Sequence, residues 1–231
     1  MIDLAGFGEQ LLLGAAMTLK LALAALAVGL ILGLLGAVGR LSGARSARAL
    51  AGAYTTVVRG LPELLVVLII YFGSSRLLSA IAEGFGHEGF VELSPFAAGV
   101  LALGLTFGAY ATEIFRGAIL AIPKGQVEAA HAFGMGRLLT FRRIVLPQLW
   151  RIALPGLGNL FLVLLKDTSL VSVIGLEELM RKAQIATGFS REPFTFYLAA
   201  AALYLLMTTV AMVVLHRAER IAGRGLPQVR G

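Results

Sequence analysis

The sequence predicts an all-α integral membrane protein with five transmembrane helices. Its 231 residues are 58% hydrophobic and only 14% charged, with a mean hydropathy of +0.86, whereas soluble domains are about half apolar and about a quarter charged. Uncharged stretches long enough to cross a bilayer also recur along the chain. This length allows about five crossings with short loops, so we expect a single domain over residues 1–231.

Three windows without a charged residue predict the first, third and fifth spans. They are 19, 20 and 24 residues long, and a helix needs about 20 apolar residues to cross the hydrocarbon core. With their flanking residues, the helices predicted from these windows occupy residues 14–39, 93–115 and 194–216.

Two shorter windows predict the second and fourth spans. Residues 64–75 and 152–165 provide only 12 and 14 uncharged positions, which is too short for a crossing. Extended to residues 51–75 and 152–176, both become long enough. Each extended segment then contains charged residues and an interruption by glycine or proline, so we expect these two spans to be irregular.

The charges between the spans predict the orientation of the chain. The loop after the first span has three basic residues and no acid, the central loop six against one, and the C-terminal tail four against one. The positive-inside rule places all three in the cytoplasm. The other loops are acidic or balanced, so we expect a periplasmic N-terminus and a cytoplasmic C-terminus. The central loop, residues 123–147, then faces the cytoplasm.

This central loop predicts two short helices joined by glycine. A helix could begin at Pro123 and continue through the alanine-rich residues 127–133. Gly134 and Gly136 then interrupt it, and a second helical stretch follows that Pro147 stops or kinks. Small side chains on such a surface would let another protein approach closely. The alternative is an ordinary connecting loop.

Seven residues of the loop carry a resemblance to a known family. In type and spacing they match the EAA loop of the membrane subunits of ABC importers, where it forms coupling helices that dock in a cleft on a cytoplasmic ATPase. The matching residues are Glu128, Ala129, Ala130, Gly134, Ile144, Leu146 and Pro147.

Other segments extend the resemblance over most of the chain. Residues 110–117, followed by 122–126, resemble the polar amino acid branch of the family, and residues 59–62 and 165–170 resemble two more of its signatures. The overall pattern is most similar to the histidine, lysine, arginine and ornithine permease group. The resemblance implies the MetI-like ABC permease fold and ATP-driven import of polar, basic amino acids. Import of opines or of other polar amino acids is the alternative, and a passive channel is a more distant one.

The resemblance also implies partners and a location. They are a second, related permease subunit, an ATPase dimer that binds ATP and Mg, and a periplasmic amino-acid-binding protein, around a multi-pass protein of the bacterial inner membrane. The residues themselves agree that the chain binds no ATP, because no lysine directly follows a glycine and a P-loop is therefore excluded.

Other function classes find little support in the sequence. The chain has no cysteine and three scattered histidines, so we expect neither a metal site nor a bound cofactor. The net charge of +7 comes without a long basic run, which argues against nucleic acid as a partner. We expect no catalytic residue, although an intramembrane enzyme using Ser, Lys and Asp near position 168 remains a competing hypothesis.

Polar residues inside the two irregular spans are candidates for a substrate pathway. An ionisable group within the bilayer is costly and usually faces a protein interior or a water-filled path. Alternatively, Arg59 with Glu63 and Lys166 with Asp167 are neutralising pairs near the membrane surfaces. The pathway candidates are Arg59, Glu63, Asn159, Lys166, Asp167, Thr168 and Ser169.

Two further patterns concern the packing of the spans. Glu113 and Arg116 are three residues apart and share a helix face at the cytoplasmic end of the third span, where they form a salt bridge or a gate. Glycine pairs four residues apart in the first and third spans let helices approach closely, either within one subunit or at a dimer seam.

Overall fold

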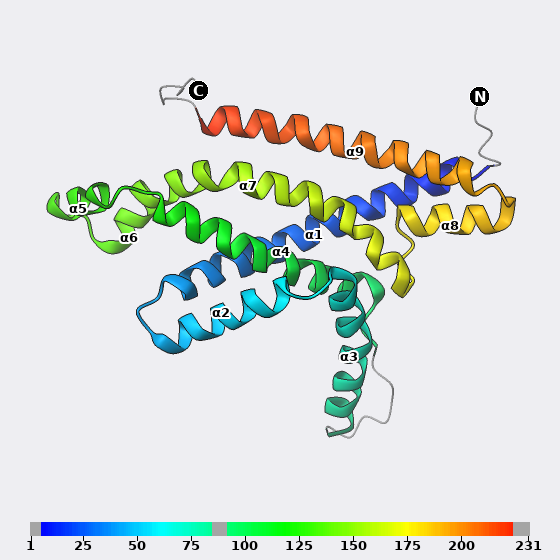
Figure 1. The fold of residues 1–231 in the computed structure, drawn as a ribbon, viewed down its shortest axis with the longest axis horizontal. Coiled ribbons are helices and arrows are strands. Elements are labelled where there is room, and N and C mark those ends of the chain that lie inside the picture. The colour runs from blue at the N-terminus through cyan, green and yellow to red at the C-terminus, as the bar shows by residue number, and fades with distance from the viewer. Residues whose placement is uncertain (1–5, 85–91, 224–231) are drawn as a thin grey trace.

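The computed structural model describes residues 6–84 and 92–223, and every regular element in these ranges is helical (Figure 1). Four helical runs are long and apolar enough to cross a membrane, and a bent pair makes a fifth. The predicted all-α membrane architecture is thus confirmed. The elements are α1 (Gly8–Leu41), α2 (Arg45–Arg59), α3 (Glu63–Gly84), α4 (Pro95–Leu120), α5 (Lys124–Ala132), α6 (Arg137–Thr140), η1 (Phe141–Val145), α7 (Leu146–Asp167), η2 (Thr168–Ile174), α8 (Leu179–Ser190) and α9 (Pro193–Ala222).

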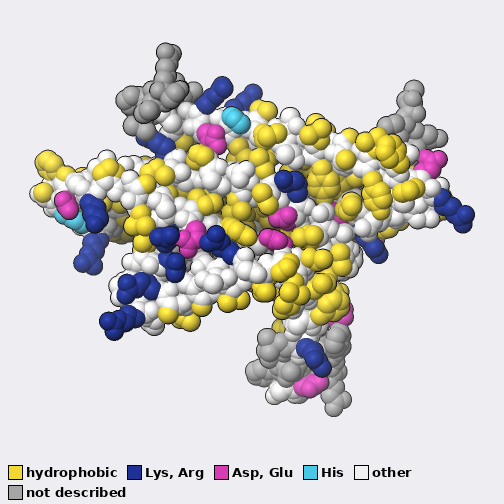
Figure 2. All heavy atoms as spheres, viewed as in Figure 1, with side chains coloured by type: hydrophobic (Ala, Val, Ile, Leu, Met, Phe, Trp, Pro, Cys, Tyr) yellow, Lys and Arg dark blue, Asp and Glu magenta, His cyan; other side chains and the backbone are white. Residues whose placement is uncertain are grey.

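The surface fits this setting. Figure 2 shows hydrophobic side chains spread over much of the viewed face, whereas many of the Lys and Arg side chains gather toward the end of the molecule that carries α2 and α5. Only Phe196, Ala200 and Met207 of α9 are buried in the isolated chain, and much of the rest of this helix is exposed. These are the features of helices that face lipid or a partner subunit.

Helices α1 and α4 form the centre of the bundle and pack closely through glycine. A Cβ atom added at Gly33 would lie 2.6 Å from the Cβ of Ala111, and one added at Gly29 would lie 2.6 Å from the ring of Phe107. These glycines therefore serve packing within one subunit, the first of the two interpretations of the glycine pairs.

The predicted span at residues 51–75 is two helices rather than one. The parts Arg45–Arg59 and Glu63–Arg76 meet at an angle of 108°, and Figure 1 shows α2 lying along the bundle while α3 extends away from it. Pro62 lacks a backbone N–H and disfavours helical geometry in the residue before it, so α2 ends at Arg59 and α3 starts afresh.

The helix that contains the predicted fourth span begins well before residue 152. A single helical run extends over Arg137–Ile174, so Pro147 does not stop the second helix of the central loop. A π-helical turn, η1, precedes α7 and the Leu146 N–H bonds to the Phe141 carbonyl across it. The wider turn delivers Pro147 into the first turn of α7, where a missing N–H is tolerated.

Candidate functional site

The turn after α5 has one defined backbone geometry. Gly134 adopts φ = 77°, the left-handed conformation that glycine reaches without a steric penalty. The Met135 N–H donates to the Ala130 carbonyl at 3.0 Å and the Gly134 N–H to the His131 carbonyl at 2.9 Å. This pair of bonds is a Schellman motif, which ends α5 and turns the chain toward α6.

The turn presents an apolar tip. Phe133 and Leu138 are 86% and 80% exposed, while Glu128 and Ala129 lie exposed on α5. We call these four side chains the α5–α6 surface. Figure 1 places α5 and α6 at one end of the molecule, beyond the ends of the long helices. Exposed aromatic and aliphatic side chains at such a tip are typical of an interaction site.

The other residues of the matching loop differ in burial, and a side-chain hydrogen bond between two glutamines links α5 to α7. Ala130 is buried, Ile144 and Leu146 are half-buried, and Pro147 is exposed. The side-chain amide of Gln148 donates to Gln126 Oε1 at 2.6 Å, which links α5 to the start of α7. The tip and the long α7 run are therefore mechanically connected.

A second candidate site is a pocket of about 270 Å³ between α3, α4 and α7. It brings together the carboxyl groups of Glu63 and Asp167, two of the predicted pathway residues, with Thr106 and the Tyr110 ring. The rest of the lining is apolar: Leu103, Phe107, Leu160, Val163 and Leu164. Two carboxyl groups in a mostly apolar pocket are suited to a cationic ligand.

Arg59 stands beside this pocket rather than in an ion pair. Its guanidinium carbon lies 5.2 Å from the centre of the Tyr110 ring, as in a cation–π contact. Among the described residues, neither Arg59 with Glu63 nor Lys166 with Asp167 forms a salt bridge. The break between α2 and α3 lies between Arg59 and Glu63. The interpretation of both pairs as neutralising pairs stays a prediction.

The remaining pathway candidates point elsewhere. Asn159 and Lys166 are exposed on α7 outside the pocket lining, and Ser169 donates to the Lys166 carbonyl at 2.8 Å. Thr168 is fully buried and donates to the Leu165 carbonyl. Sequence reasoning did not select Thr106 or Tyr110 for the pocket, although a hydroxyl at both positions of an i, i+4 pair in an uncharged span was a usable signal.

Comparison with known proteins decides the family. The family described as "Binding-protein-dependent transport system inner membrane component" matches residues 25–221. The chain belongs to this family. It is a multi-pass inner-membrane permease. Its relatives indicate the class of transporter to which it belongs.

Two relatives and one solved structure show the relationship of this permease. The octopine transport system permease protein OccQ of Agrobacterium tumefaciens (strain Ach5) is 52% identical over 221 residues, covering 96% of this chain and 93% of the relative. The histidine/lysine/arginine/ornithine permease HisQ of Escherichia coli (strain K12) is 44% identical over 215 residues, covering 93% and 94%. A crystal structure of an amino acid ABC transporter with histidines superposes with a TM-score of 0.79 at 35% identity, covering 94% and 95%.

These findings establish the coarse function. The chain is the permease component of an amino acid ABC importer and has the MetI-like fold.

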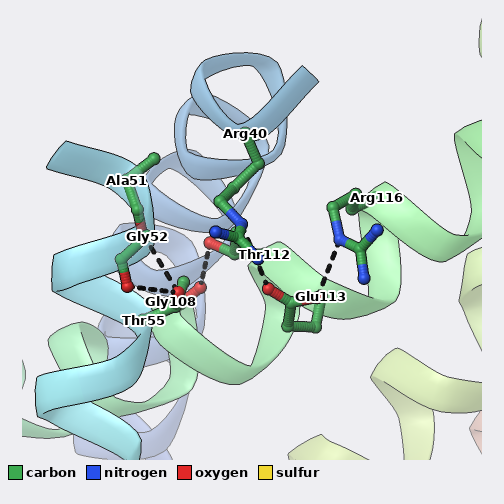
Figure 3. A network of polar contacts seen from close by, with 8 residues as sticks. All are labelled: Arg40, Ala51, Gly52, Thr55, Gly108, Thr112, Glu113 and Arg116. Atoms are coloured by element: carbon green, nitrogen blue, oxygen red, sulfur yellow. Dashed lines mark hydrogen bonds and ion pairs between the residues drawn. The ribbon is translucent and has the colours of Figure 1, made fainter. Parts of the chain in front are cut away.

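Glu113 of the permease joins α1 to α4 (Figure 3). Its Oε2 atom lies 2.8 Å from Arg116 Nε, the ion pair expected from the sequence, and its Oε1 atom lies 3.5 Å from Nε of Arg40 on α1. Gly52 of α2 lets the guanidinium pass, since a Cβ there would lie 2.7 Å from Arg40 Nη1. The Glu113 carboxylate thus pairs with two arginines where α1, α2 and α4 meet. Whether it also gates transport stays a prediction.

Glu178 is a buried carboxyl group that the sequence did not single out. Its Oε1 atom accepts from the Arg181 N–H at 2.8 Å and caps α8, and its Oε2 atom accepts from the hydroxyls of Tyr204 at 3.0 Å and Thr18 at 3.4 Å. The side chain is completely buried. Burial raises the pKa of Glu178, against the opposing effect of these donors. The residue ties α1, α8 and α9 together.

Proposed function

We propose that this permease moves basic amino acids such as arginine, histidine, lysine and ornithine from the periplasm to the cytoplasm. The observation that carries the proposal is the meeting of Glu63 and Asp167 in one pocket at the α3–α4–α7 junction. An ammonium or guanidinium group is held well by carboxylates, and guanidinium can bind them in a bidentate way.

The arginine beside the pocket supports an amino acid rather than a simple cation. Arg59 lies against Tyr110 at one wall, within reach of a ligand that contacts this ring. The Arg59 guanidinium would donate hydrogen bonds to the α-carboxylate of the ligand, while Glu63 and Asp167 would bind its basic side chain. The pocket volume of about 270 Å³ is slightly below the range of small-molecule sites, which begins at about 300 Å³.

Energy would come from a partner ATPase dimer that binds ATP and Mg. The α5–α6 surface supports this part of the proposal, because Phe133 and Leu138 need a partner to cover them. Closure of the ATPases on ATP would move this tip, and α7 would carry the movement to Asp167 at its far end. A periplasmic binding protein would deliver the amino acid on the opposite side.

A second permease subunit would complete the pathway. Asn159 and Lys166 share an exposed face of α7, and polar groups at such positions rarely face lipid. Exposed Leu65, Ile69 and Phe72 form an apolar stripe on α3. We infer that these two faces contact the second subunit, identical or related, and enclose the pocket.

An opine is the second candidate substrate. OccQ, a permease for octopine transport by its name, is 52% identical to this chain, compared with 44% for HisQ. The pocket chemistry does not separate a basic amino acid from a larger ligand that carries the same cationic group.

Uptake into proteoliposomes containing the permease with its membrane, ATPase and binding-protein partners tests the proposal. Radiolabelled arginine, histidine, octopine and glutamine are compared with and without ATP. We expect ATP-dependent uptake of the basic substrates that falls at least about tenfold in Glu63→Gln and in Asp167→Asn, a loss of about 1.4 kcal/mol or more. Glu92→Gln is the matched control, because Glu92 is exposed and lies outside the pocket.

Three outcomes would reject parts of this account. Unchanged uptake in both pocket variants would remove the carboxylate pair from recognition. Preference for octopine over arginine would establish the opine alternative. Uptake that continues without ATP would favour a passive channel.

A further inference from the structure

A large apolar groove lies on a different side of α7 from the substrate pocket. It has a volume of about 500 Å³ and runs between α1, α7 and α9. Apart from Gly158, every lining side chain is hydrophobic. Figure 2 shows hydrophobic side chains over the face where α7 and α9 lie next to each other. No residue of the substrate pocket lines this groove.

The length of the groove matches one leaflet of a membrane. Its lining extends over residues 19–30 of α1 and 150–161 of α7, and 11 steps along a helix cover about 17 Å at about 1.5 Å per residue. The hydrocarbon core is about 30 Å thick, so one leaflet is about 15 Å. Because these helices cross the membrane, the groove runs in the direction of the lipid chains.

A second hollow continues the groove around Trp150. It measures about 310 Å³, lies between α1, α4 and the start of α7, and shares Leu30 and Trp150 with the groove. Its lining is also hydrophobic. Two adjoining apolar hollows separated by one tryptophan suit the two acyl chains of a phospholipid. Tryptophan is itself favoured at the level of lipid headgroups.

The end of the groove near Trp150 is basic. Arg151 directly follows Trp150 and precedes Leu154 by three residues, so it lies at the edge of the α7 lining. Arg217 follows Val214 by three residues, so it lies one turn beyond the α9 lining. The Nε atom of Arg151 is buried and has no hydrogen-bond partner. Within the described part of the chain, neither arginine forms an ion pair. A phosphate group would supply an acceptor for Arg151 Nε and a counter-charge for Arg217.

We propose that the groove between α1, α7 and α9 binds an anionic phospholipid, with its acyl chains in the two hollows and its phosphate at Arg151 and Arg217. The second permease subunit is assigned under the proposed function to another face of α7, which carries Asn159 and Lys166, and neither residue lines the groove. Basic sites between spanning helices are a known means of binding anionic headgroups.

Photolabelling of the purified transporter complex tests this site. Phosphatidylglycerol with a photoreactive group on one acyl chain is added, and the labelled peptides are mapped by mass spectrometry. We expect labels within residues 19–30 and 150–161. Ala211→Phe puts a ring into the groove, and its labelling should fall at least about tenfold. Ala202→Phe, an exposed position of α9 outside the groove, should label like the parent.

Headgroup specificity is tested in the parent protein and in an Arg151→Gln, Arg217→Gln variant. Unlabelled phosphatidylglycerol should compete with the probe at least about tenfold better than phosphatidylcholine in the parent, and this preference should disappear in the variant. Equal competition by the two lipids in the parent would overturn the proposal, even if Ala211→Phe failed to fold. Labels spread evenly over all exposed helices, or no labels in the groove, would also overturn it.

Discussion

At the scale of single residues, the turn between α5 and α6, for which we propose a coupling role, depends on one backbone conformation. Gly134 adopts φ = 77°, which costs an alanine about 1–2 kcal/mol. We predict that Gly134→Ala lowers the population of the native turn about 5- to 30-fold and reduces ATP-dependent uptake accordingly. The measurement is substrate uptake by the reconstituted transporter, with the amount of folded permease checked by size-exclusion chromatography.

Gly188→Ala is the control for that substitution. Gly188 is exposed within α8, has no positive φ, and an added Cβ would meet no atom within 4 Å. Alanine in a helix is more favourable than glycine by about 1 kcal/mol, so this variant should transport normally. Equal uptake by the two variants would mean that coupling does not require the left-handed turn.

Glu178 gives a second prediction at this scale. Alanine would leave the Arg181 N–H and the Tyr204 and Thr18 hydroxyls without their acceptor, and each bond to a charged group contributes about 1.5–3 kcal/mol. We therefore expect Glu178→Ala to unfold at least about 5 °C lower than the parent, since about 1 kcal/mol shifts the midpoint by about 2–4 °C. Thermal unfolding of the purified permease is the measurement, and an unchanged midpoint would show that this junction contributes nothing to stability.

The pH dependence of the same group has a definite sign. Burial raises the pKa of Glu178 in the folded state, so above the ordinary glutamate value of about 4.3 the folded state holds this proton more tightly than the unfolded state. Its contribution to stability therefore falls as pH rises through the folded-state pKa. Glu178→Gln cannot titrate, so the midpoint of the parent minus that of Glu178→Gln should decrease from pH 4.5 to pH 7.5. A difference that increases with pH would contradict the raised pKa.

At the scale of helices, the sequence predicted where the spans lie better than how they bend. Windows free of charge located α1, α4 and α9 because lipid excludes charge over the whole length of a crossing. The 108° bend between α2 and α3 depends on packing against the bundle, and Pro62 indicated only an interruption. At Pro147 the sequence predicted a stop or a kink, but the helix continues through this position because a π-helical turn precedes the proline.

The contact between α1 and α4 can be tested by a double-mutant cycle. Gly33→Ala brings a methyl group to 2.6 Å from the Cβ of Ala111, and overpacking of this kind costs about 1–3 kcal/mol. Ala111→Gly removes that methyl group, so the double variant should be more stable than the sum of the single effects by at least about 0.5 kcal/mol. Thermal unfolding midpoints supply the four values. Simple additivity would show that the helices move apart instead.

At the scale of the whole molecule, the sequence predicts a site only when its residue types are rare in the kind of segment that contains them. Charges in an interrupted apolar span are unusual, and Glu63 and Asp167 were found in that way before the structure brought them into one pocket. Thr106 and Tyr110 looked like ordinary span residues. Thr168 lies outside this pocket because the chain changes after Asp167 to a 3₁₀-helix, whose three residues per turn redirect the side chains that follow. Its role in the pathway stays a prediction.

The number and direction of the crossings can be measured directly, because the chain contains no cysteine. Single cysteines are introduced at Gly43, Gly125 and Gly188, all exposed and free of neighbours around an added Cβ. With five crossings and basic loops in the cytoplasm, a membrane-impermeant maleimide should label only Gly188→Cys in intact spheroplasts. Inverted vesicles should reverse this pattern and label Gly43→Cys and Gly125→Cys.

The same three variants separate five crossings from four. If the bent pair α2 and α3 entered and left the membrane on one side, only α4 would cross between positions 43 and 125. Gly43→Cys and Gly125→Cys would then be labelled from opposite sides. Labelling of both from the cytoplasmic side requires the bent pair to cross. Helix α5 would then lie on the cytoplasmic side, as the proposed ATPase contact requires, and Glu63 would lie within a crossing segment, as the proposed substrate contact requires.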